Sequence, residues 1–420
     1  MMKLNLVDRK PRVLLLLPTR TYRASDFLSA ARQLEVEVVI ASDHPQTLSE
    51  LSPLKSLSLD FRCPEQATQD ILSFAEEYPI DAVVGADDDT TILATMAAKE
   101  LSLPHNTIES AYATRDKHQL RRILEGAGLR SPWFKLASVN ENPERVANRI
   151  DFPCVLKPLS LSASRGVIRA NDSAEFVDAF NRVAAILRSS SDEDEHHGDA
   201  EHLLVEGFIP GVEVALEGIV VRGELKVLAI FDKPDPLDGP FFEETLYITP
   251  SRHSTHVQQE IAACTADAAN ALGLREGPVH AELRITDDCA WMLEIAPRSI
   301  GGLCARTLRF GTGMSLEELI IRHAIGQDVN LFEREVRAAG VMMISIPHAG
   351  TLREVRGNSQ AETVEGIEEV TITIPIGQKV VPLPEGKRYL GFIFARGETP
   401  NDVESALRNA HRRLEFIIEQ

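Results

Sequence analysis

The sequence predicts an α/β N-terminal part followed by α+β parts, and three observations lead to this fold class. Aliphatic runs alternate with helical patterns over roughly residues 10–110, which is typical of a parallel sheet whose strands are joined by helices. Two segments of alternating polarity flank residues 287–289 and predict an antiparallel hairpin. Short strands and a final helix after Gly340 indicate a separate α+β unit. A chain of 420 residues exceeds one typical core, so we expect two or three domains.

The composition is that of an ordinary soluble globular protein, with 44% hydrophobic and 25% charged residues. A net charge of −19 argues against a general nucleic-acid-binding surface, although a local cluster of Lys and Arg can still bind a nucleotide. No apolar run approaches the roughly 20 residues of a membrane span. The cysteines are scattered without CxxC spacing, which favours reduced thiols in a cytoplasmic enzyme over disulfides or a zinc site. They are Cys63, Cys154, Cys264, Cys289 and Cys304.

The N-terminal alternation predicts a Rossmann-like sheet. The expected strands are Arg12–Leu17, Glu35–Ile40 and Ile80–Gly85, and the expected helices are Ser25–Leu34, Ala67–Tyr78 and Thr90–Leu101. A GxGxxG fingerprint is absent, so no dinucleotide is assigned to this sheet.

The segment Ala86–Thr90 lies where a predicted strand ends and a helix begins. Open α/β sheets usually bind ligands at this edge. Capping of the helix by Asp89 or Thr90 explains at least one of these residues without a function. Both interpretations stay open at this point.

The middle of the chain predicts a basic helix and a small-residue loop. The helix is expected over Ala111–Ala127, and two strands follow at Pro132–Leu136 and Pro153–Lys157. A lysine at the end of an aliphatic strand is costly unless an anion pairs with it. The loop Ser160–Val167 can present backbone N–H groups to a phosphate. Residues 189–201 are acidic and lack apolar side chains, so they predict a mobile surface insertion in which His196 and His197 are solvated.

The remaining elements alternate strands and helices. The expected strands are Leu203–Val205, Glu213–Val221, Lys226–Phe231, Val341–Pro347 and Val370–Pro375, and the expected helices are Thr255–Leu272, Leu316–Gly326 and Asn401–Glu419. A long Pro-rich loop, Asp232–Pro250, carries Lys233, for which a solvated position is the default.

The hairpin around residues 287–289 carries two carboxylates at matching positions. Its expected core-facing residues are Val279, Ala281, Leu283 and Ile285 on one strand and Trp291, Leu293 and Ile295 on the other. A three-residue turn would place Glu282 directly opposite Glu294. Facing like charges destabilise a sheet by up to roughly 1 kcal/mol. A divalent cation bound between the two carboxylates would make the arrangement favourable. The alternative is an ordinary solvated polar face.

These features occur in an order that resembles the ATP-grasp superfamily over nearly the whole chain. The segment Thr114–Lys117 with Leu124 and Gly126–Leu129 looks like the entry to that fold, and Phe152–Pro158 looks like its second-lysine strand. The segment Ser162–Val167 is similar to the family's mobile phosphate loop. The segment Val205–Glu213 is similar to its hinge. Walker A and kinase motifs are absent.

The resemblance implies an ATP and Mg²⁺ site (with Mn²⁺ as a substitute), and it implies a role for individual residues. Phosphates would be bound by Lys117, Lys157 and the loop residues Ser162, Ser164 and Gly166, with Lys233 as a further candidate. Adenine would be bound by Glu206, Phe208 and Ile209, ribose by Glu213, the metal by Glu282 and Glu294, and the reacting group by Arg298 and His280. A structural histidine is the alternative for His280.

One departure from the family pattern stands at Ala296, where many members have a metal-binding Asn. A small residue there, the segment Gly277–Glu282 and the distal part of the chain look like the L-amino acid ligase branch. The resemblance thus implies a carboxylate–amine ligase working through an acyl-phosphate on small-molecule acids and amines such as amino acids, with no nucleic-acid or membrane partner. A carboxylating or formyl-transferring relative and a non-catalytic nucleotide sensor are the alternatives. A homodimer is common among such enzymes.

The expected domains follow from the same resemblance. Residues 1–110 would form a Rossmann-like N-terminal domain, 111–335 an ATP-grasp domain whose smaller lid subdomain covers about 130–205, and 336–420 a small C-terminal α+β domain.

Overall fold

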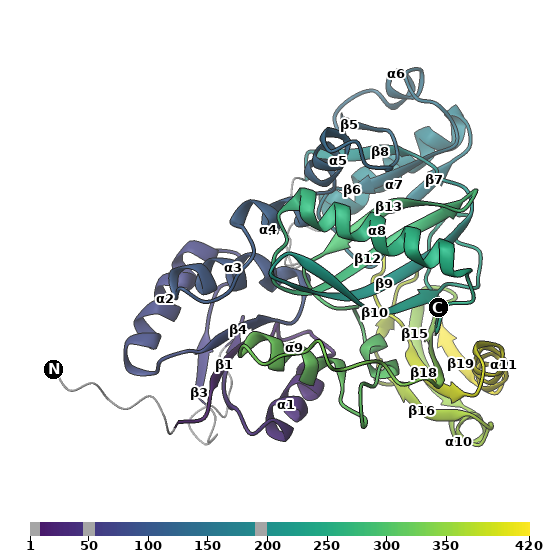
Figure 1. Ribbon diagram of the computed structural model, residues 1–420. Coiled ribbons are helices and arrows are strands. Elements are labelled where there is room, and N and C mark those ends of the chain that lie inside the picture. Colours follow the sequence, from purple (N-terminus) through teal and green to yellow (C-terminus); the bar gives the residue numbers. More distant parts are fainter. Residues whose placement is uncertain (1–8, 45–54, 190–199) are drawn as a thin grey trace.

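A computed structural model describes residues 9–44, 55–189 and 200–420, and these residues contain four sheets (Figure 1). The predicted acidic insertion, with His196 and His197, falls almost wholly outside the described residues. Mixed parallel and antiparallel sheets with flanking helices confirm the predicted fold class.

The N-terminal sheet is parallel, as the alternation predicted. Its strand order is β3-β2-β1-β4, formed by β3 (Lys55–Ser58), β2 (Glu37–Ser42), β1 (Arg12–Leu16) and β4 (Ala82–Gly85). Leu14 and Leu16 pack on one face, in a core shared with α2 (Pro64–Glu77) and α3 (Thr91–Glu100). Val13 and Leu15 pack on the other face, in a core shared with α1 (Ala24–Gln33) and α9 (Leu316–Ala324). Burial on both faces explains the continuous aliphatic run of β1.

The predicted basic helix is wrong as a single element, because it is divided at Asp116. Two helices replace it, α4 (Ile108–Arg115) and α5 (Lys117–Gly126). Asp116 is extended, and its Oδ1 accepts hydrogen bonds from the backbone N–H groups of His118 at 2.8 Å and Gln119 at 3.1 Å. Aspartate is a favoured N-cap, so it ends one helix and starts the next. Lys117 therefore occupies the first turn of α5.

The region predicted as a lid contains a four-stranded sheet, called the lid sheet below, with the order β5-β8-β6-β7. The strands are β5 (Phe134–Ser138), β8 (His202–Gly207), β6 (Cys154–Pro158) and β7 (Ile168–Ala170). Helices α6 (Pro143–Ala147) and α7 (Ser173–Ser189) cover one face and share its core.

The largest sheet has eight strands and joins the centre of the molecule to its C-terminal part (Figure 1). Its order is β13 (Cys289–Ala296), β12 (Gly277–Thr286), β9 (Val212–Val221), β10 (Glu224–Asp232), β11 (Leu246–Thr249), β14 (Ala338–Ile344), β18 (Gly391–Gly397) and β16 (Ile367–Ile372), with antiparallel neighbours throughout. Helix α8 (Thr255–Leu272) covers one face of β9, β12 and β13. The sheet runs across residue 336, where a domain boundary was expected, and that division stays a prediction.

The predicted last helix is correct only in its first half. Helix α11 (Pro400–His411) is followed by β19 (Glu415–Glu419), which pairs with β15 (Gly350–Arg356) beside β17 (Lys379–Val380). Phe416 and Ile418 pack on the C-terminal core, which also holds α10 (Asn358–Glu362) and α11. Their two-residue spacing is the strand signal that the helical assignment overlooked.

The hairpin of β12 and β13 has the predicted pairing but a different turn. Thr286 pairs with Cys289, so the turn contains only Asp287 and Asp288, with φ of 49° and 60°. A register shift follows between Leu283 and Glu282, and it restores Glu282 opposite Glu294. The like-charged pair therefore results from a bulge rather than from a three-residue turn.

The bulge also changes which side chains of β13 reach the core. Met292 and Ile295 pack under α8, whereas Trp291 and Leu293, expected in the core, do not belong to this cluster. The polar face of β12 is not solvated, because His280 and Arg284 are only 6% and 2% exposed. This buried polar face forms the floor of the site described below.

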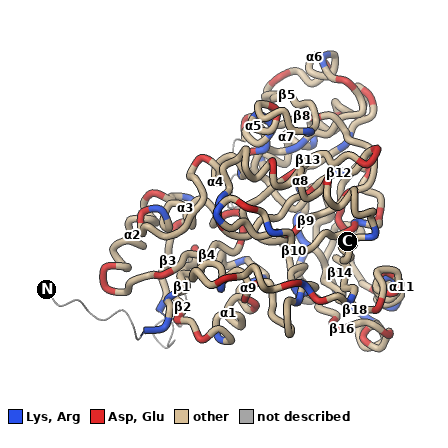
Figure 2. Tube along the Cα trace, viewed as in Figure 1, with Lys and Arg blue, Asp and Glu red and all other residues tan. Residues whose placement is uncertain are grey.

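All five cysteines are free thiols. Within the described residues, none of the helices has the length and apolar character needed to cross a membrane. In the view of Figure 2, Lys and Arg are interspersed with Asp and Glu over all parts of the described chain.

The Pro210–Gly211 turn docks closely against the end of β12 and gives a test of the fold. Gly211 has φ of +102°, and an added Cβ would lie 2.0 Å from the carbonyl oxygen of Ile285. Gly277 has a similar φ of +94° but meets nothing within 4 Å. Gly277→Ala should lower the free energy of unfolding by about 1 kcal/mol through its left-handed backbone. Gly211→Ala should lower the free energy of unfolding by roughly 2 kcal/mol more than Gly277→Ala, because its Cβ would overlap the carbonyl oxygen of Ile285. If urea unfolding showed the same loss of free energy for both variants, the close docking of Gly211 would be contradicted.

Candidate active site

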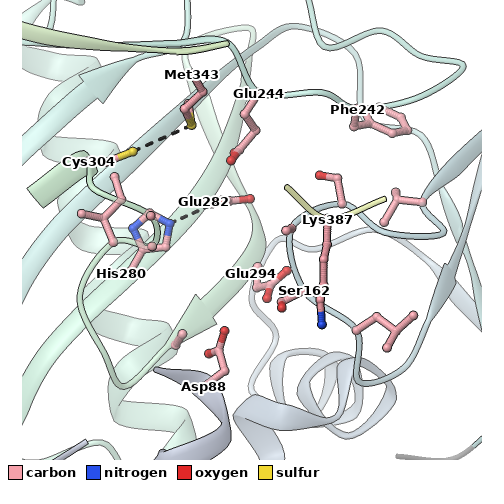
Figure 3. A pocket seen from close by; sticks show the side chains of 18 of the residues that line it. Asp88, Ser162, Phe242, Glu244, His280, Glu282, Glu294, Cys304, Met343 and Lys387 are labelled. Carbon is pink, nitrogen blue, oxygen red and sulfur yellow. Dashed lines mark hydrogen bonds and ion pairs between the residues drawn. The ribbon is translucent and has the colours of Figure 1, made fainter. Parts of the chain in front are cut away.

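A cavity of about 640 Å³ lies between the N-terminal sheet, the lid and the polar face of β12 (Figure 3). Most of the residues predicted from the sequence line it: Lys117, Lys157, Ser162, Ser164, Glu206, Phe208, Ile209, Glu213, His280, Glu282, Glu294 and Arg298. Gly166 and Lys233 are not among the lining residues. The Gly166 N–H instead donates to the carbonyl oxygen of Pro384 at 2.9 Å.

The two predicted phosphate lysines are both close to carboxylates. Lys117 Nζ donates to the carbonyl oxygen of Leu161 at 2.8 Å and lies 3.7 Å from Glu294 Oε2. Lys157 Nζ forms an ion pair with Glu206 Oε1. The costly lysine at the end of β6 is therefore paired, as the sequence required.

The phosphate loop itself carries unusual backbone conformations. Ala163 and Ser164 both have positive φ, at 54° and 55°. Such conformations are uncommon for residues other than glycine and concentrate at functional sites. Ser162 and Glu294, both labelled in Figure 3, line the same cavity.

The hinge carboxylate Glu206 is buried between two cations. Arg121 Nε donates to Glu206 Oε2 at 3.0 Å, and Lys157 holds the other oxygen. Burial would raise the pKa of Glu206, but Arg121 and Lys157 outweigh it and lower the pKa. A second Arg121 nitrogen donates to the carbonyl oxygen of the bulge residue Leu293 at 2.7 Å. Sequence reasoning saw Arg121 only as part of a basic helix and assigned it no partner.

An aromatic side chain flanked by cations forms the neighbouring wall. The guanidinium carbons of Arg169 and Arg284 lie 3.9 Å and 4.9 Å from the centre of the Phe208 ring. The Phe208 N–H donates to the carbonyl oxygen of Pro153 at 3.1 Å, and the Ile209 carbonyl accepts from Arg284 Nη1 at 2.8 Å. The hinge backbone is thus fixed by both the lid and β12.

Three carboxylates surround the buried ammonium group of Lys233. Lys233 Nζ lies 2.7 Å from Glu213, 2.5 Å from Glu244 and 3.5 Å from Glu282. Burial would lower the pKa of Lys233, but the three carboxylates outweigh it and raise the pKa well above the ordinary value. The expected solvated loop position is therefore wrong. Within the described residues, Glu213, Glu244 and Glu282 have ligand atoms within 4.8 Å of one another.

Glu244 was not selected from the sequence, although it lies in the Pro-rich loop and lines the cavity. The Tyr247 hydroxyl donates to Glu244 Oε1 at 2.5 Å. Burial raises the pKa of Glu244 despite the nearby Lys233. The only sequence signal was the paired acid Glu243–Glu244, which is common on solvated loops.

The residues at the hairpin fit a magnesium ion in their chemistry. Glu282 and Glu294 face each other in the register of β12 and β13, and both line the cavity. Their side chains retain 24% and 34% exposure, so their oxygens are accessible from the cavity. Carboxylate oxygens are the hard ligands that Mg²⁺ prefers. Ala296 lines the same cavity and offers no oxygen.

His280 shares a strand face with Glu282, as predicted, and both of its ring nitrogens face carboxylates. Its Nδ1 lies 2.5 Å from Glu217 Oε1, and its Nε2 lies 3.3 Å from Glu282 Oε1. Burial would lower the pKa of His280, but the two carboxylates outweigh it and raise the pKa to about 9.

Arg298 is held by the N-terminal sheet through Asp88. Its Nε and Nη2 donate to the two oxygens of Asp88, each at 2.9 Å. The neighbouring Asp87 and Thr90 form a capping box. The capping aspartate is thus Asp87 and not the expected Asp89, which accepts a hydrogen bond from Arg115. Asp87, Asp88 and Asp89 all line the cavity, as expected for this edge of the sheet.

Other residues that line the cavity come from parts of the chain in which no sequence pattern predicted a role in the site. The N-terminal loop contributes Thr21, Tyr22 and Arg23, and the C-terminal part contributes Gln378, Lys387, Arg388, Tyr389 and Phe392. Their approach depends on tertiary packing, which local sequence patterns do not encode.

Comparison with known families agrees with this geometry. Residues 150–307 match the ATP-grasp domain, and residues 342–419 match the L-amino acid ligase C-terminal domain 2. These two parts of the chain are thus similar to an ATP-grasp domain and to a C-terminal domain of the L-amino acid ligase type. The predicted resemblance to ATP-grasp ligases is confirmed.

Individual relatives are similar over part of their length. Alanine–anticapsin ligase of Bacillus subtilis (strain 168) is 26% identical over 238 residues, which cover 53% of this chain and 50% of that protein. A D-alanine–D-alanine ligase of Flavobacterium johnsoniae is 26% identical over 219 residues, covering 49% of this chain and 62% of that protein. The alignments therefore span about half to two thirds of these curated relatives.

A solved structure shares the fold over its whole length. The L-amino acid ligase from Bacillus licheniformis matches with a TM-score of 0.83 at 24% sequence identity, covering 98% of this chain and 100% of that one.

The contact between Asp88 and Arg298 predicts a pH-dependent contribution to stability. Burial would raise the pKa of Asp88, but Arg298 and Arg115 outweigh it and hold the pKa below its ordinary value of 3.8. Asp88→Asn should lower the free energy of unfolding by about 3 kcal/mol at pH 7, since it leaves Arg298 without its buried partner. A lowered folded-state pKa stabilises above the unfolded-state value, so this difference should shrink as the pH falls below about 4.

Urea unfolding at pH 7, 5 and 3.5 checks this prediction. The control is Asp60→Asn, which removes the same charge from an exposed pair with Arg62 and should change stability little. A loss for Asp88→Asn that stays constant down to pH 3.5 would contradict the assigned electrostatic origin.

Proposed function

We propose that this protein is an ATP-dependent carboxylate–amine ligase that joins small-molecule substrates such as amino acids through an acyl-phosphate intermediate. The single observation that supports this most is the convergence of two lysines, two facing carboxylates and an arginine on one cavity: Lys117, Lys157, Glu282, Glu294 and Arg298. The match to a C-terminal domain of the L-amino acid ligase type favours amino acids as substrates. The three expected domains form part of the same proposal.

The nucleotide would lie between the lid and the eight-stranded sheet. Phe208, Ile209 and Glu206 would border the adenine, and Glu213 would face the ribose. Lys117, Lys157 and the loop with Ser162, Ser164 and Gly166 would contact the phosphates, with Lys233 nearby. The family resemblance suggests these roles, and the places of the residues in the cavity support them for all but Gly166 and Lys233, which do not line it.

Glu282 and Glu294 would hold Mg²⁺, which would neutralise phosphate charge when bound. The substrate carboxylate oxygen would attack the γ-phosphorus of ATP, the bond from that phosphorus to the bridging oxygen would break, and ADP would leave. The amine nitrogen would then attack the acyl carbon, lose a proton and displace phosphate. Arg298, fixed by Asp88, would steady the phosphoryl oxygens during both steps.

Water must be kept from such an intermediate, because it would hydrolyse the mixed anhydride. Residues of the lid sheet and of the loop Ser162–Val167 line the cavity. Closure of this loop over bound nucleotide would exclude water.

A screen of ADP release over pooled L-amino acids and small carboxylates tests the proposed function. We expect ADP formation only when an acid and an amine are both supplied with Mg²⁺, together with a new amide product in the mass spectrum. Excess chelator should abolish ADP formation. Release that requires bicarbonate or formate instead would identify a carboxylating or formyl-transferring enzyme, and no release with retained ATP binding would identify a nucleotide sensor.

Replacing Glu294 with Gln should remove turnover and leave nucleotide binding weakened but measurable. The substitution preserves shape while it removes one of the two proposed metal carboxylates and the ion pair with Lys117. We expect kcat to fall at least about 100-fold, the scale of losing electrostatic stabilisation of a reacting group. Glu276→Gln, at a carboxylate paired with His323 and outside the cavity lining, is the matched control. Wild-type turnover in Glu294→Gln would refute its role.

A further inference from the structure

A fully buried carboxylate, Glu217, lies directly behind the proposed metal site. Glu217 is on β9, is 0% exposed and does not line the cavity. It pairs with His280 in the register of β9 and β12, so the two side chains share one face. Carboxylates are almost never fully buried unless they are paired. The partner of Glu217 is the imidazole of His280, at 2.5 Å from its Nδ1.

The contact continues from His280 to the proposed metal ligand. The Nε2 atom of His280 lies 3.3 Å from Glu282 Oε1, the interaction drawn as a dashed line in Figure 3. The same oxygen lies 3.5 Å from Lys233 Nζ. Two nitrogen groups thus meet one oxygen of Glu282, and one of them is itself oriented by Glu217.

A simple structural pair would not require this alignment. A second histidine–carboxylate pair near β12 illustrates the difference. His323 Nε2 lies 3.3 Å from Glu276 and accepts from the Gly277 N–H, and neither of these partners lines the cavity. Glu217 and His280 instead form a row of side chains that ends on a cavity carboxylate. That carboxylate, Glu282, lies opposite Glu294 in the register of the hairpin.

We propose that Glu217 is a positioning residue that acts through His280 to orient Glu282 for binding a divalent cation. The inference rests on the proposed nucleotide–metal site, and it adds a residue to which the family comparison assigns no role. Partners that hydrogen-bond to metal ligands commonly change metal affinity by about 10–100-fold when they are replaced.

The test measures metal binding rather than turnover. Mn²⁺ titrated into the full-length protein with saturating ADP is followed by the electron paramagnetic resonance signal of free Mn²⁺. Glu217→Gln keeps the shape of the side chain and removes its charge, and we expect its Mn²⁺ dissociation constant to rise about tenfold. The affinity for ADP measured in chelator should stay within about twofold of wild type. In turnover, the Mg²⁺ concentration for half-maximal rate should rise, while kcat at saturating Mg²⁺ should change much less.

A double-variant comparison separates positioning from general destabilisation. His280→Asn removes the ring that connects Glu217 to Glu282, so Glu217→Gln should weaken Mn²⁺ binding no further in that background. Glu276→Gln is the matched control and should leave Mn²⁺ affinity unchanged. Thermal unfolding of each variant without ligands shows whether it is folded, and His280→Asn alone tests the row if Glu217→Gln does not fold.

The outcomes distinguish this inference from the proposed function. Unchanged Mn²⁺ affinity in both site variants, additive losses in the double variant, or an equal loss in Glu276→Gln would each overturn the role of Glu217. Normal Mn²⁺ binding without any amine-dependent ADP release would instead contradict the ligase activity and leave the positioning role intact. Failure of the wild-type protein to bind Mn²⁺ with ADP would overturn both.

Discussion

The burial of charge on one face of strand β12 is the constraint on which the site depends. His280, Glu282 and Arg284 alternate with the apolar residues beneath α8, and the whole polar row lies under the cavity rather than in water. Buried charges are stable only with partners. Strand β9 supplies two of them, since Glu217 and Glu213 lie in register with His280 and Arg284. The cation nearest to Glu282 outside β12 is Lys233, whose Nζ lies 3.5 Å from its Oε1. The floor of the site is therefore a sheet of matched charges.

Other parts of the molecule supply further charged partners to the site. The N-terminal sheet supplies Asp88 to Arg298, helix α5 supplies Arg121 to Glu206, and the loop after β10 supplies Lys233. Each contact joins segments that are distant in the sequence, so the cavity exists only when these parts are assembled. A site with this many cross-links holds its side chains in place before a ligand arrives, which is what catalysis by positioning requires.

Much of the fold and of the candidate site could be predicted because local sequence patterns indicate them. Strand alternation gave the facing of Glu282 and Glu294, and the ordered lysines and hinge gave the ATP-grasp resemblance. The errors came from features that a pattern cannot resolve. A bulge at Leu293 exchanged the core face of β13, Asp116 divided one periodic helix into two, and Lys233 gained three carboxylate neighbours through a loop whose path is set by tertiary packing. The contact of Glu217 with His280 could not be predicted for the same reason, because it depends on the register between β9 and β12.

The pairing of the cations has a consequence for how a nucleotide enters. Among the described residues, Lys117, Lys157, Lys233 and Arg298 each lie within 4 Å of a carboxylate. A nucleoside triphosphate would therefore meet a site in which these four cations are already paired with carboxylates, in a chain of net charge −19. Coulomb attraction in such a site gains little until further positive charge accompanies the phosphates. Carboxylates that repel a bare nucleotide attract its complex with a divalent cation, so the same acidic residues that appear unfavourable for ATP select the metal-bound form. In the proposed nucleotide–metal site, the balance of charge in the floor, rather than an excess of basic residues, would therefore couple nucleotide binding to metal binding.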